Sequence, residues 1–192
     1  MSRAAVDKDQ SADPVENRWT DLARSGDENA FAALVRLHQD RLYRVALRMT
    51  AEPQDAQDAV QETFLQAWQH LPGFRGDAQF STWVTRILIN KCHNAHRARR
   101  PTDPLPDEAR SALELPQAPA AETLALAAHR RDAVRKALLT LPLEQRTPLA
   151  LTTFGGYTHA ETARILGISE SAAKVRAHRA RRALATLLQE WR

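Results

Sequence analysis

The strongest chemical feature of this sequence is a run of cationic side chains near its C-terminus. Between Glu170 and Arg192 there are six Lys or Arg residues against two Glu residues. Lysine and arginine neutralise phosphates, and both can donate hydrogen bonds to guanine edges in a major groove. This segment therefore indicates nucleic-acid binding.

The residues around this run have the spacing of two helices joined by a tight turn. Thr158 and Glu161 form a capping-box pattern, Gly167 permits a left-handed turn, and Ser169 can cap a second helix. Small and apolar residues then recur at steps of three and four, and we expect them to be buried: Ala173, Ala177, Ala180, Leu184, Leu187 and Trp191. The pattern predicts a helix-turn-helix motif.

At about 100° per residue, the other side of the second helix faces away from this alanine stripe. The candidate DNA-contacting residues on or beside that side are Ser171, Lys174, Val175, Arg176, His178, Arg179 and Arg182. An isolated run of charge is more often a solvated surface. Here the caps, the turn glycine and the alanine stripe occur together, which favours DNA binding.

The first half of the sequence carries two oppositely charged segments. From Ala51 to Glu62 there are four acidic residues and no basic one, and from Val84 to Arg100 there are five basic residues and no acidic one. The net charge is only +4, so the position of the charges matters more than their sum. Because DNA repels an acidic helix, we expect the acidic segment to contact a protein and the basic segment to contact nucleic acid.

Composition and periodicity predict an all-α fold of two small helical domains. The chain has few glycines and is rich in residues that favour helices. Apolar residues recur at helical spacing after Asp27, after Pro53 and from Phe80, which predicts a three-helix bundle. In the second domain, Pro148 is expected to kink its helix or delay the start of that helix.

A proline-rich linker is expected to join the domains, because five of the ten prolines lie between Pro101 and Pro119. We place a flexible tail at residues 1–17, the first domain at 18–100, the linker at 101–121 and the second domain at 122–192.

Both halves resemble the extracytoplasmic-function (ECF) class of bacterial RNA polymerase sigma factors. The stretch DAQDAVQETFLQAWQHLPGFRGDAQFSTWVTRILINKCHNAHRARR is similar to their second domain, and the segment from LPLEQRTPLALTTF to RAHRARRAL is similar to their fourth. The resemblance implies a subunit that binds core RNA polymerase, directs it to promoter DNA and is controlled by an anti-sigma factor.

The same resemblance implies roles for three groups of residues. The acidic helix would dock on the coiled coil of the polymerase's largest subunit through Asp55, Asp58, Gln61, Glu62, Leu65 and Trp68. A loop and the next helix would hold a flipped base and the melted strand of the minus-ten element through Phe74, Arg75, Gly76, Asp77, Gln79, Arg86, Asn90, Lys91, Asn94 and Arg97. The positions that match the family's contacts to the minus-thirty-five element are Lys174, Val175, Arg176, His178 and Arg179.

The chain departs from the family pattern at several positions. Many members have a small polar residue where Val175 stands and a β-branched residue where Ala173 stands, so the promoter sequence recognised here is expected to differ. Phe80 and Trp83 could stack on a base, but their helical spacing favours packing in the core.

No catalytic or cofactor site is expected. Cys92, His93 and His96 resemble part of a metal site, but zinc normally takes four ligands and the neighbours are cationic, so we favour a buried, inert thiol. No nucleotide-binding loop, nucleophile motif or small-molecule substrate site is visible. We therefore predict neither an enzyme nor a cofactor.

The main alternative is an ordinary helix-turn-helix regulator that binds operator DNA without polymerase, usually as a dimer. A single cysteine fits a reducing compartment, and neither a signal peptide nor a membrane-spanning run is visible, so we expect a cytoplasmic protein without membrane insertion.

Overall fold

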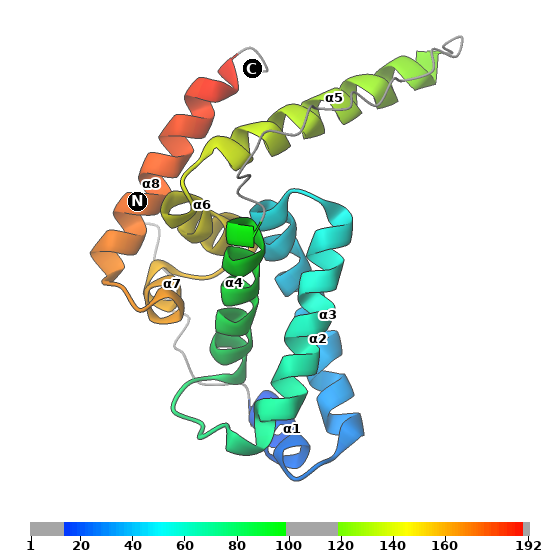
Figure 1. Cartoon of the computed structure of the whole chain (residues 1–192), viewed down its shortest axis with the longest axis vertical. Helices are drawn as coiled ribbons and strands as arrows, with labels where there is room; N and C mark the ends of the chain where they lie inside the picture. The colour runs from blue at the N-terminus through cyan, green and yellow to red at the C-terminus, as the bar shows by residue number, and fades with distance from the viewer. Residues whose placement is uncertain (1–13, 99–118, 190–192) are drawn as a thin grey trace, which may run out of the picture.

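The computed structural model describes residues 14–98 and 119–189, and all regular elements in these two ranges are helical (Figure 1). The first range contains α1 (Pro14–Arg24), α2 (Glu28–Thr50), α3 (Pro53–His70), the short 3-10 helix η1 (Leu71–Gly73) and α4 (Phe80–Ala98). The second contains α5 (Pro119–Thr140), α6 (Leu143–Leu149), the π-helical segment η2 (Ala150–Phe154), α7 (His159–Leu166) and α8 (Glu170–Leu187). The predicted all-α class and the helix-turn-helix motif are confirmed.

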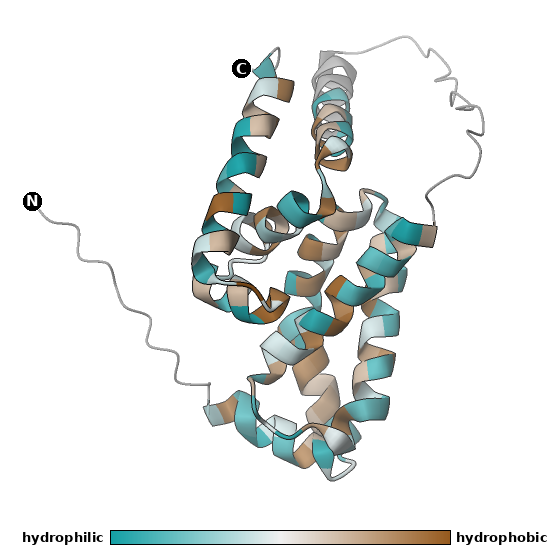
Figure 2. Cartoon of the chain, turned by 60° about the vertical axis from the view of Figure 1, so that its left-hand side comes forward, coloured by the Kyte–Doolittle hydropathy of each residue, from teal (hydrophilic) through white to brown (hydrophobic). Residues whose placement is uncertain are grey.

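The first domain is built around the three predicted helices. Asp27 accepts hydrogen bonds from the backbone N–H groups of Asn29 and Ala30 and so starts α2. The helix ends at Thr50, its C-cap Ala51 adopts a left-handed conformation with φ 65°, and Pro53 then starts α3. The buried side chains of α2, α3 and α4 form one core, and apolar residues line the inside of the bundle in Figure 2.

Helix α1 was not predicted, since residues 14–17 were placed in the tail. Its Glu16 carboxylate accepts a hydrogen bond from the Ser81 N–H at 3.2 Å and lies 3.3 Å from Nε2 of His38. The carboxylate thus satisfies a free N–H at the start of α4, a contact over 65 positions that local spacing cannot reveal. Residues 1–13 and 99–118 lie outside the described residues. They include most of the linker expected at 101–121, whose last three residues belong to α5.

Pro148 lies inside α6, where we predicted a kink or a delayed start of the helix. It has no N–H for an i to i−4 bond, and the backbone after it widens into the π-helical segment η2, in which the Gly155 N–H bonds to the Ala150 carbonyl at 2.9 Å. The helix is neither delayed nor broken. Instead, its register changes directly after the proline.

The helix-turn-helix motif has the predicted caps. Thr158 and Glu161 form a reciprocal capping box, Gly167 adopts a left-handed conformation with φ 65°, and Ser169 caps α8. Ala173, Ala177 and Ala180 are fully buried. The predicted stripe fails at Leu187, which is 50% exposed, and Trp191 lies outside the described residues.

The two domains are packed against each other. Helix α7 lies beside α4, and Ala150, Leu151, Tyr157 and Ile165 of the second domain belong to the core cluster of the first (Figure 1). Helix α5 extends away from this packed body. The N-terminal domain and the helix-turn-helix motif therefore share buried surface.

Candidate functional site

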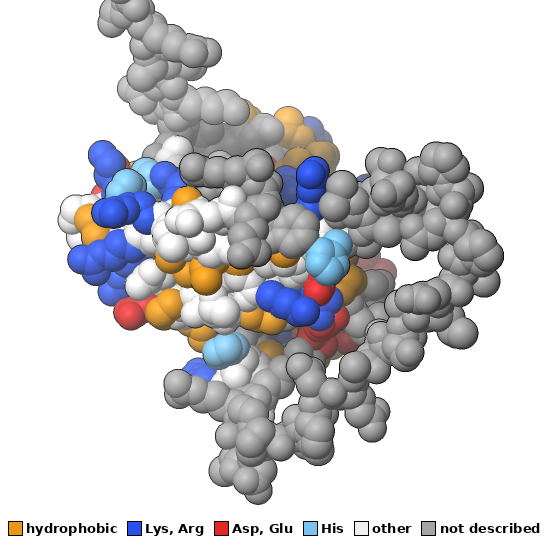
Figure 3. Space-filling view, turned by 90° about the horizontal axis from the view of Figure 1, so that it is seen from above, with side chains coloured by type: hydrophobic (Ala, Val, Ile, Leu, Met, Phe, Trp, Pro, Cys, Tyr) orange, Lys and Arg blue, Asp and Glu red, His pale blue; other side chains and the backbone are white. Residues whose placement is uncertain are grey.

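The exposed side of α8 carries the predicted DNA-contacting residues. Ser171, Lys174, His178, Arg179 and Arg182 are exposed, and Arg176 is half-buried beside them. Val175 is 47% exposed although it is apolar. Lys, Arg and His side chains gather at the left of Figure 3, which is the side of α8 in Figure 1. The surface combines positive charge with one apolar side chain that could pack on a thymine methyl.

The acidic helix predicted to bind a protein is α3. Asp58, Gln61 and Glu62 are exposed, and Asp55 and Trp68 are half-buried. Leu65 is 60% exposed on the same helix, one of the most exposed large apolar side chains in the described ranges. Carboxylates around an exposed leucine suit a protein partner with basic and apolar side chains.

Most of the loop between α3 and α4 presents polar groups to solvent. Arg75, Gly76 and Asp77 are exposed. The loop has a positive φ of 79° at Gly76, a conformation that glycine adopts without strain. Phe74 differs, because only 8% of it is exposed and its ring packs on Trp83 with centroids 4.9 Å apart. Phe80 is buried, in agreement with the core role favoured for it.

The basic face of α4 contains the remaining candidates for the minus-ten element. Arg86, Asn90, Asn94 and Arg97 are exposed and recur at steps of three or four, so they share one side of the helix. The Arg97 guanidinium donates to the Asn94 side chain at 2.5 Å. Lys91 is half-buried and pairs with Glu62 of α3 at 3.1 Å, which joins the basic and acidic surfaces directly.

Cys92 and His93, which suggested part of a metal site, lie in different environments. Cys92 is buried, and burial raises the pKa of its thiol to about 12, so the thiolate is strongly disfavoured at neutral pH. His93 faces the second domain, where its Nε2 lies 3.0 Å from the Thr147 hydroxyl, and burial lowers its pKa. Across residues 14–98 and 119–189, the structure contains no group of three potential metal ligands.

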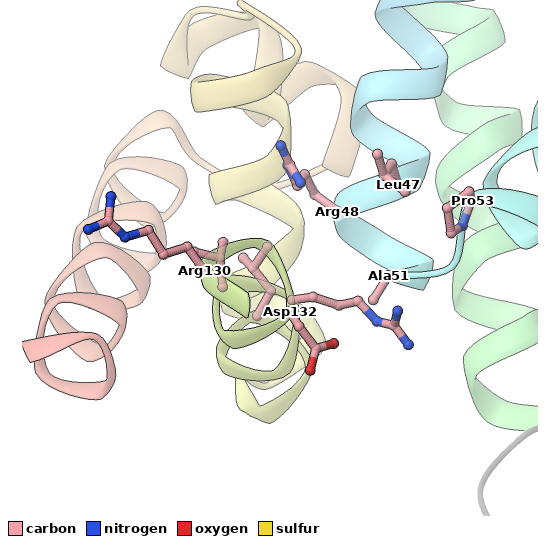
Figure 4. Close-up of a pocket in the computed structure, with 9 residues that line it drawn as sticks. Leu47, Arg48, Ala51, Pro53, Arg130 and Asp132 are labelled. Carbon is pink, nitrogen blue, oxygen red and sulfur yellow. The ribbon is translucent and has the colours of Figure 1, made fainter. Parts of the chain in front are cut away.

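Two grooves border the contact between the domains. One, of about 470 Å³, is lined by acidic residues of α3, by α4 and by Leu139 of α5. The other, of about 710 Å³, lies between the end of α2 and α5 (Figure 4). Leu47, Ala51 and Pro53 form one wall of this larger groove, and Arg130 and Asp132 lie on the other.

The residues that hold the domains together were missed by the sequence analysis. Arg41, Arg44 and Arg48 of α2 recur at steps of three and four, and all three contact the segment Phe154–Tyr157. Arg146 of α6 is buried and bonds to carbonyl groups in both domains. Only the regular spacing of the α2 arginines could have indicated a shared surface.

Comparisons with known proteins identify both domains. Residues 34–102 match the family model of sigma-70 region 2, and residues 131–184 match that of sigma-70 region 4. The chain is 38% identical over 166 residues to the ECF RNA polymerase sigma factor SigM of Mycobacterium tuberculosis, a match that covers 85% of this chain and 80% of the relative. The chain belongs to the ECF sigma factors.

Other relatives agree with this assignment. The RNA polymerase sigma-H factor of Pseudomonas aeruginosa is 32% identical over 186 residues, covering 91% of this chain and 94% of the relative. A solved structure of CnrH in complex with the cytosolic domain of CnrY is 29% identical, covers 92% of this chain and 98% of that chain, and superposes with a TM-score of 0.71. The sigma factor RpoE of Bartonella quintana, solved with the anti-sigma factor NepR, has the same fold at 23% identity and a TM-score of 0.62, with 83% of this chain and 96% of that chain covered.

Membership of this family decides between the two hypotheses drawn from the sequence. The protein is a sigma factor for transcription initiation by RNA polymerase and not an operator-binding regulator that acts alone. Sigma factors are initiation factors and not enzymes. None of the helices in the described ranges is long and apolar enough to cross a membrane.

Proposed function

We propose that this sigma factor binds core polymerase and the two promoter elements through three separate surfaces. The exposed face of α3, with Asp55, Asp58, Gln61, Glu62, Leu65 and Trp68, docks on core RNA polymerase. The loop from Phe74 to Gln79 and the basic face of α4 hold the minus-ten element, and the exposed side of α8 holds the minus-thirty-five element. The main support for polymerase docking by α3 is the exposed Leu65 with carboxylates around it, because DNA phosphates repel an acidic surface.

Within the minus-ten site, we propose different roles for buried and exposed residues. Arg75, Asp77 and Gln79 contact the flipped base, whereas Phe74 packs on Trp83 and supports the loop from inside. Arg86, Asn90, Asn94 and Arg97 follow the melted strand, where guanidinium groups pair with phosphates and amides bond to base edges. Lys91 orients the basic face by its ion pair with Glu62.

We propose two further properties of the protein from its relatives. CnrH was solved with the cytosolic domain of CnrY, and the Bartonella RpoE was solved with the anti-sigma factor NepR; we expect an anti-sigma factor for this protein too. We also expect no catalytic activity, no cofactor and a cytoplasmic location, where polymerase and genome meet.

Run-off transcription with purified core polymerase tests the proposal. Initiation from a subset of genomic promoter fragments is expected only when this chain is added. The matched control is the same reaction with the full chain carrying Lys174→Ala and Arg179→Ala, both at exposed positions of α8, which should bind polymerase but select promoters poorly. Transcription from all fragments without selection would contradict the proposed roles of α4 and α8.

Lys174 offers a sharper test of the minus-thirty-five surface. The substitution Lys174→Ala removes one exposed cation from the N-terminal half of α8. We expect the holoenzyme to bind its promoter roughly 5- to 150-fold more weakly, as for the loss of one specific base contact worth about 1–3 kcal/mol. Arg181→Ala, which removes an exposed cation outside the proposed contact set, is the control. Equal effects in a filter-binding titration would show that α8 supplies only general positive charge.

A further inference from the structure

The loop proposed to hold the flipped base has few backbone contacts of its own. In the part of the chain that the structure describes, no backbone hydrogen bond engages residues 75–78. The loop begins at Phe74, whose N–H donates to the Leu71 carbonyl at 3.0 Å. It ends at Gln79, whose carbonyl accepts from the Trp83 N–H at 3.1 Å in the first turn of α4. The positions of the base-contacting groups therefore depend on how these two ends are held.

Helix α1 contacts the elements on both sides of this loop. It packs on α2, and it also lies against η1, which precedes the loop, and against α4, which follows it. Figure 1 shows α1 and the loop at the same end of the bundle. Trp19 of α1 packs on the core of the first domain, and Thr20 is buried. A helix fixed in this way can hold both ends of the loop.

The most specific contact of α1 is made by Glu16. Its side chain is only 16% exposed, and one carboxylate oxygen accepts a hydrogen bond from the Ser81 N–H at 3.2 Å. Ser81 is the second residue of α4, so its N–H has no acceptor within that helix. The residue before α4 is Gln79, and glutamine is not among the residues favoured as N-caps. Glu16 therefore supplies from α1 a cap that the sequence before α4 does not favour.

Charge and packing support the same contact. A carboxylate at the start of a helix lies at the positive end of the helix dipole. Nε2 of the buried His38 on α2 lies 3.3 Å from the same oxygen of Glu16. The His38 ring lies beside Phe80, the first residue of α4, with ring centres 5.6 Å apart. The carboxylate is thus enclosed where α1, α2 and α4 meet.

A row of aromatic rings connects the start of α4 with the start of the loop. The ring of Phe80 lies 5.8 Å from that of Trp83, and the ring of Trp83 lies 4.9 Å from that of Phe74, measured between ring centres. Phe80 and Phe74 are both buried. Because closely packed side chains transmit small shifts, a movement of the first turn of α4 would displace Phe74 as well. Both ends of the loop are therefore coupled to the hydrogen bond of Ser81.

We propose that Glu16 is a positioning residue for recognition of the minus-ten element. Its carboxylate lies inside the bundle and fixes the first turn of α4, and that turn sets where Arg75, Asp77 and Gln79 meet the flipped base. This inference rests on the proposed function of the loop. It gives α1, which lies outside the three proposed binding surfaces, a part in promoter selection.

Discrimination at single positions of the minus-ten element tests the proposal. The DNA is a promoter fragment selected in run-off transcription with the full chain and core polymerase. Each nucleotide of its minus-ten element is replaced in turn by an abasic one, and the affinity of the holoenzyme for the unmodified fragment is divided by that for each abasic fragment. One correctly read base corresponds to a ratio of about 5 to 150. We expect the flipped base to give the largest ratio with the parent chain.

Three substitutions of Glu16 separate its hydrogen bond from its charge. Glu16→Gln keeps an acceptor oxygen at the same reach without the charge, Glu16→Asp keeps the charge on a side chain one methylene shorter, and Glu16→Ala removes both. We expect the ratio at the flipped base to fall at least about fivefold in the alanine and aspartate variants, as for the loss of a hydrogen bond to a charged group. The glutamine variant should stay within about threefold of the parent chain. Affinity for core polymerase should change less than about twofold in all three, because the exposed face of α3 is unaltered.

The matched control is Asp21→Ala, which removes an exposed carboxylate of the same helix that pairs with Arg24. Hydrogen exchange over residues 75–83 of the full chain, followed by mass spectrometry, measures the cap without DNA. Exchange at the start of α4 should be faster in Glu16→Ala and Glu16→Asp than in the parent chain and the control. If Glu16→Ala folds poorly, Glu16→Asp carries the comparison, because it keeps a charged side chain on α1.

An equal loss of affinity at every position of the minus-ten element would overturn the proposal, because Glu16 would then serve only the stability of the domain. Discrimination kept by Glu16→Asp and lost by Glu16→Gln would also overturn it, since charge and not the hydrogen bond to Ser81 would decide. Unchanged exchange in Glu16→Ala, with normal discrimination by the parent chain, would refute the cap alone. If the parent chain itself discriminated at no position, the proposed function of the loop would fail instead, whatever the exchange showed of the cap.

Discussion

Replacing both Asp58 and Glu62 by lysine is expected to weaken binding to core RNA polymerase by at least about 100-fold. Both carboxylates are exposed on α3 within two turns of Leu65, so they are positioned to face a basic partner surface. Each reversal replaces an attraction by a repulsion, and like charges at an interface cost several kcal/mol, of which about 2.7 kcal/mol already corresponds to 100-fold. Fluorescence anisotropy of the labelled chain titrated with core enzyme measures the change.

A variant with the same change in charge at another place isolates the surface. Asp21→Lys combined with Asp40→Lys reverses two exposed carboxylates on α1 and α2, away from α3. This control should bind polymerase within about threefold of the parent, because long-range effects of charge are largely screened at physiological salt. Equal losses in both variants would mean that only the total charge matters, and α3 would no longer be the candidate docking helix.

The ion pair between Glu62 and Lys91 adds a second consequence. Because Glu62→Lys replaces the ion-pair partner of Lys91 by a second cation, it should also disturb the basic surface on α4. The single variant Asp58→Lys leaves the pair of Glu62 and Lys91 intact, since Asp58 accepts its hydrogen bond from Gln54 of its own helix. Comparison of the single and double variants therefore separates docking from promoter binding.

The sequence was most informative where structure depends on local spacing. Thr158, Gly167 and Ser169 specify the turn of the helix-turn-helix motif by themselves, because a cap or a left-handed residue acts on its nearest neighbours. The alanine stripe of α8 was likewise predictable from a repeat of three and four. The predicted exposed side of α8 followed from the same geometry.

The sequence was least informative where two distant segments meet. Nothing near Glu16 indicates that its carboxylate caps α4, and nothing near Tyr157 indicates a partner at Thr85. Leu187 shows the converse error, since helical periodicity predicts a face but not whether another helix covers it. The packing of the two domains was missed for the same reason, because its contacts join positions about 70 to 115 residues apart.

Arg146 shows how one residue can serve both domains. Only 1% of it is exposed, and its guanidinium donates to the Leu139 and Leu141 carbonyls at 2.9 and 3.0 Å within the second domain. It also donates to the Met49 carbonyl of α2 at 2.9 Å. Burial lowers the pKa of this group, but an arginine remains protonated, so the carbonyl groups at two helix ends replace a carboxylate as its partners.

The substitution Arg146→Leu is expected to lower the free energy of unfolding by about 3–5 kcal/mol, as for breaking a buried charged network. The carbonyl groups of Met49, Leu139 and Leu141 would lose their donors inside the protein, which costs more than the hydrogen bonds alone. Urea denaturation followed by tryptophan fluorescence and circular dichroism measures the loss. Arg130→Leu removes an exposed arginine in the same domain and should change stability by less than about 0.5 kcal/mol.

The two domains should not be affected equally by Arg146→Leu. Two of its three bonds lie within the second domain, so that domain is expected to unfold first, while α2, α3 and α4 keep their own core. Arg146→Lys should recover only part of the stability, because a single ammonium group cannot match the fork geometry that contacts carbonyls in different directions. A fall in the free energy of unfolding below about 1 kcal/mol for Arg146→Leu would mean that water reaches the carbonyl groups. Arg146 would then not be the residue that joins α2 to α5 and α6.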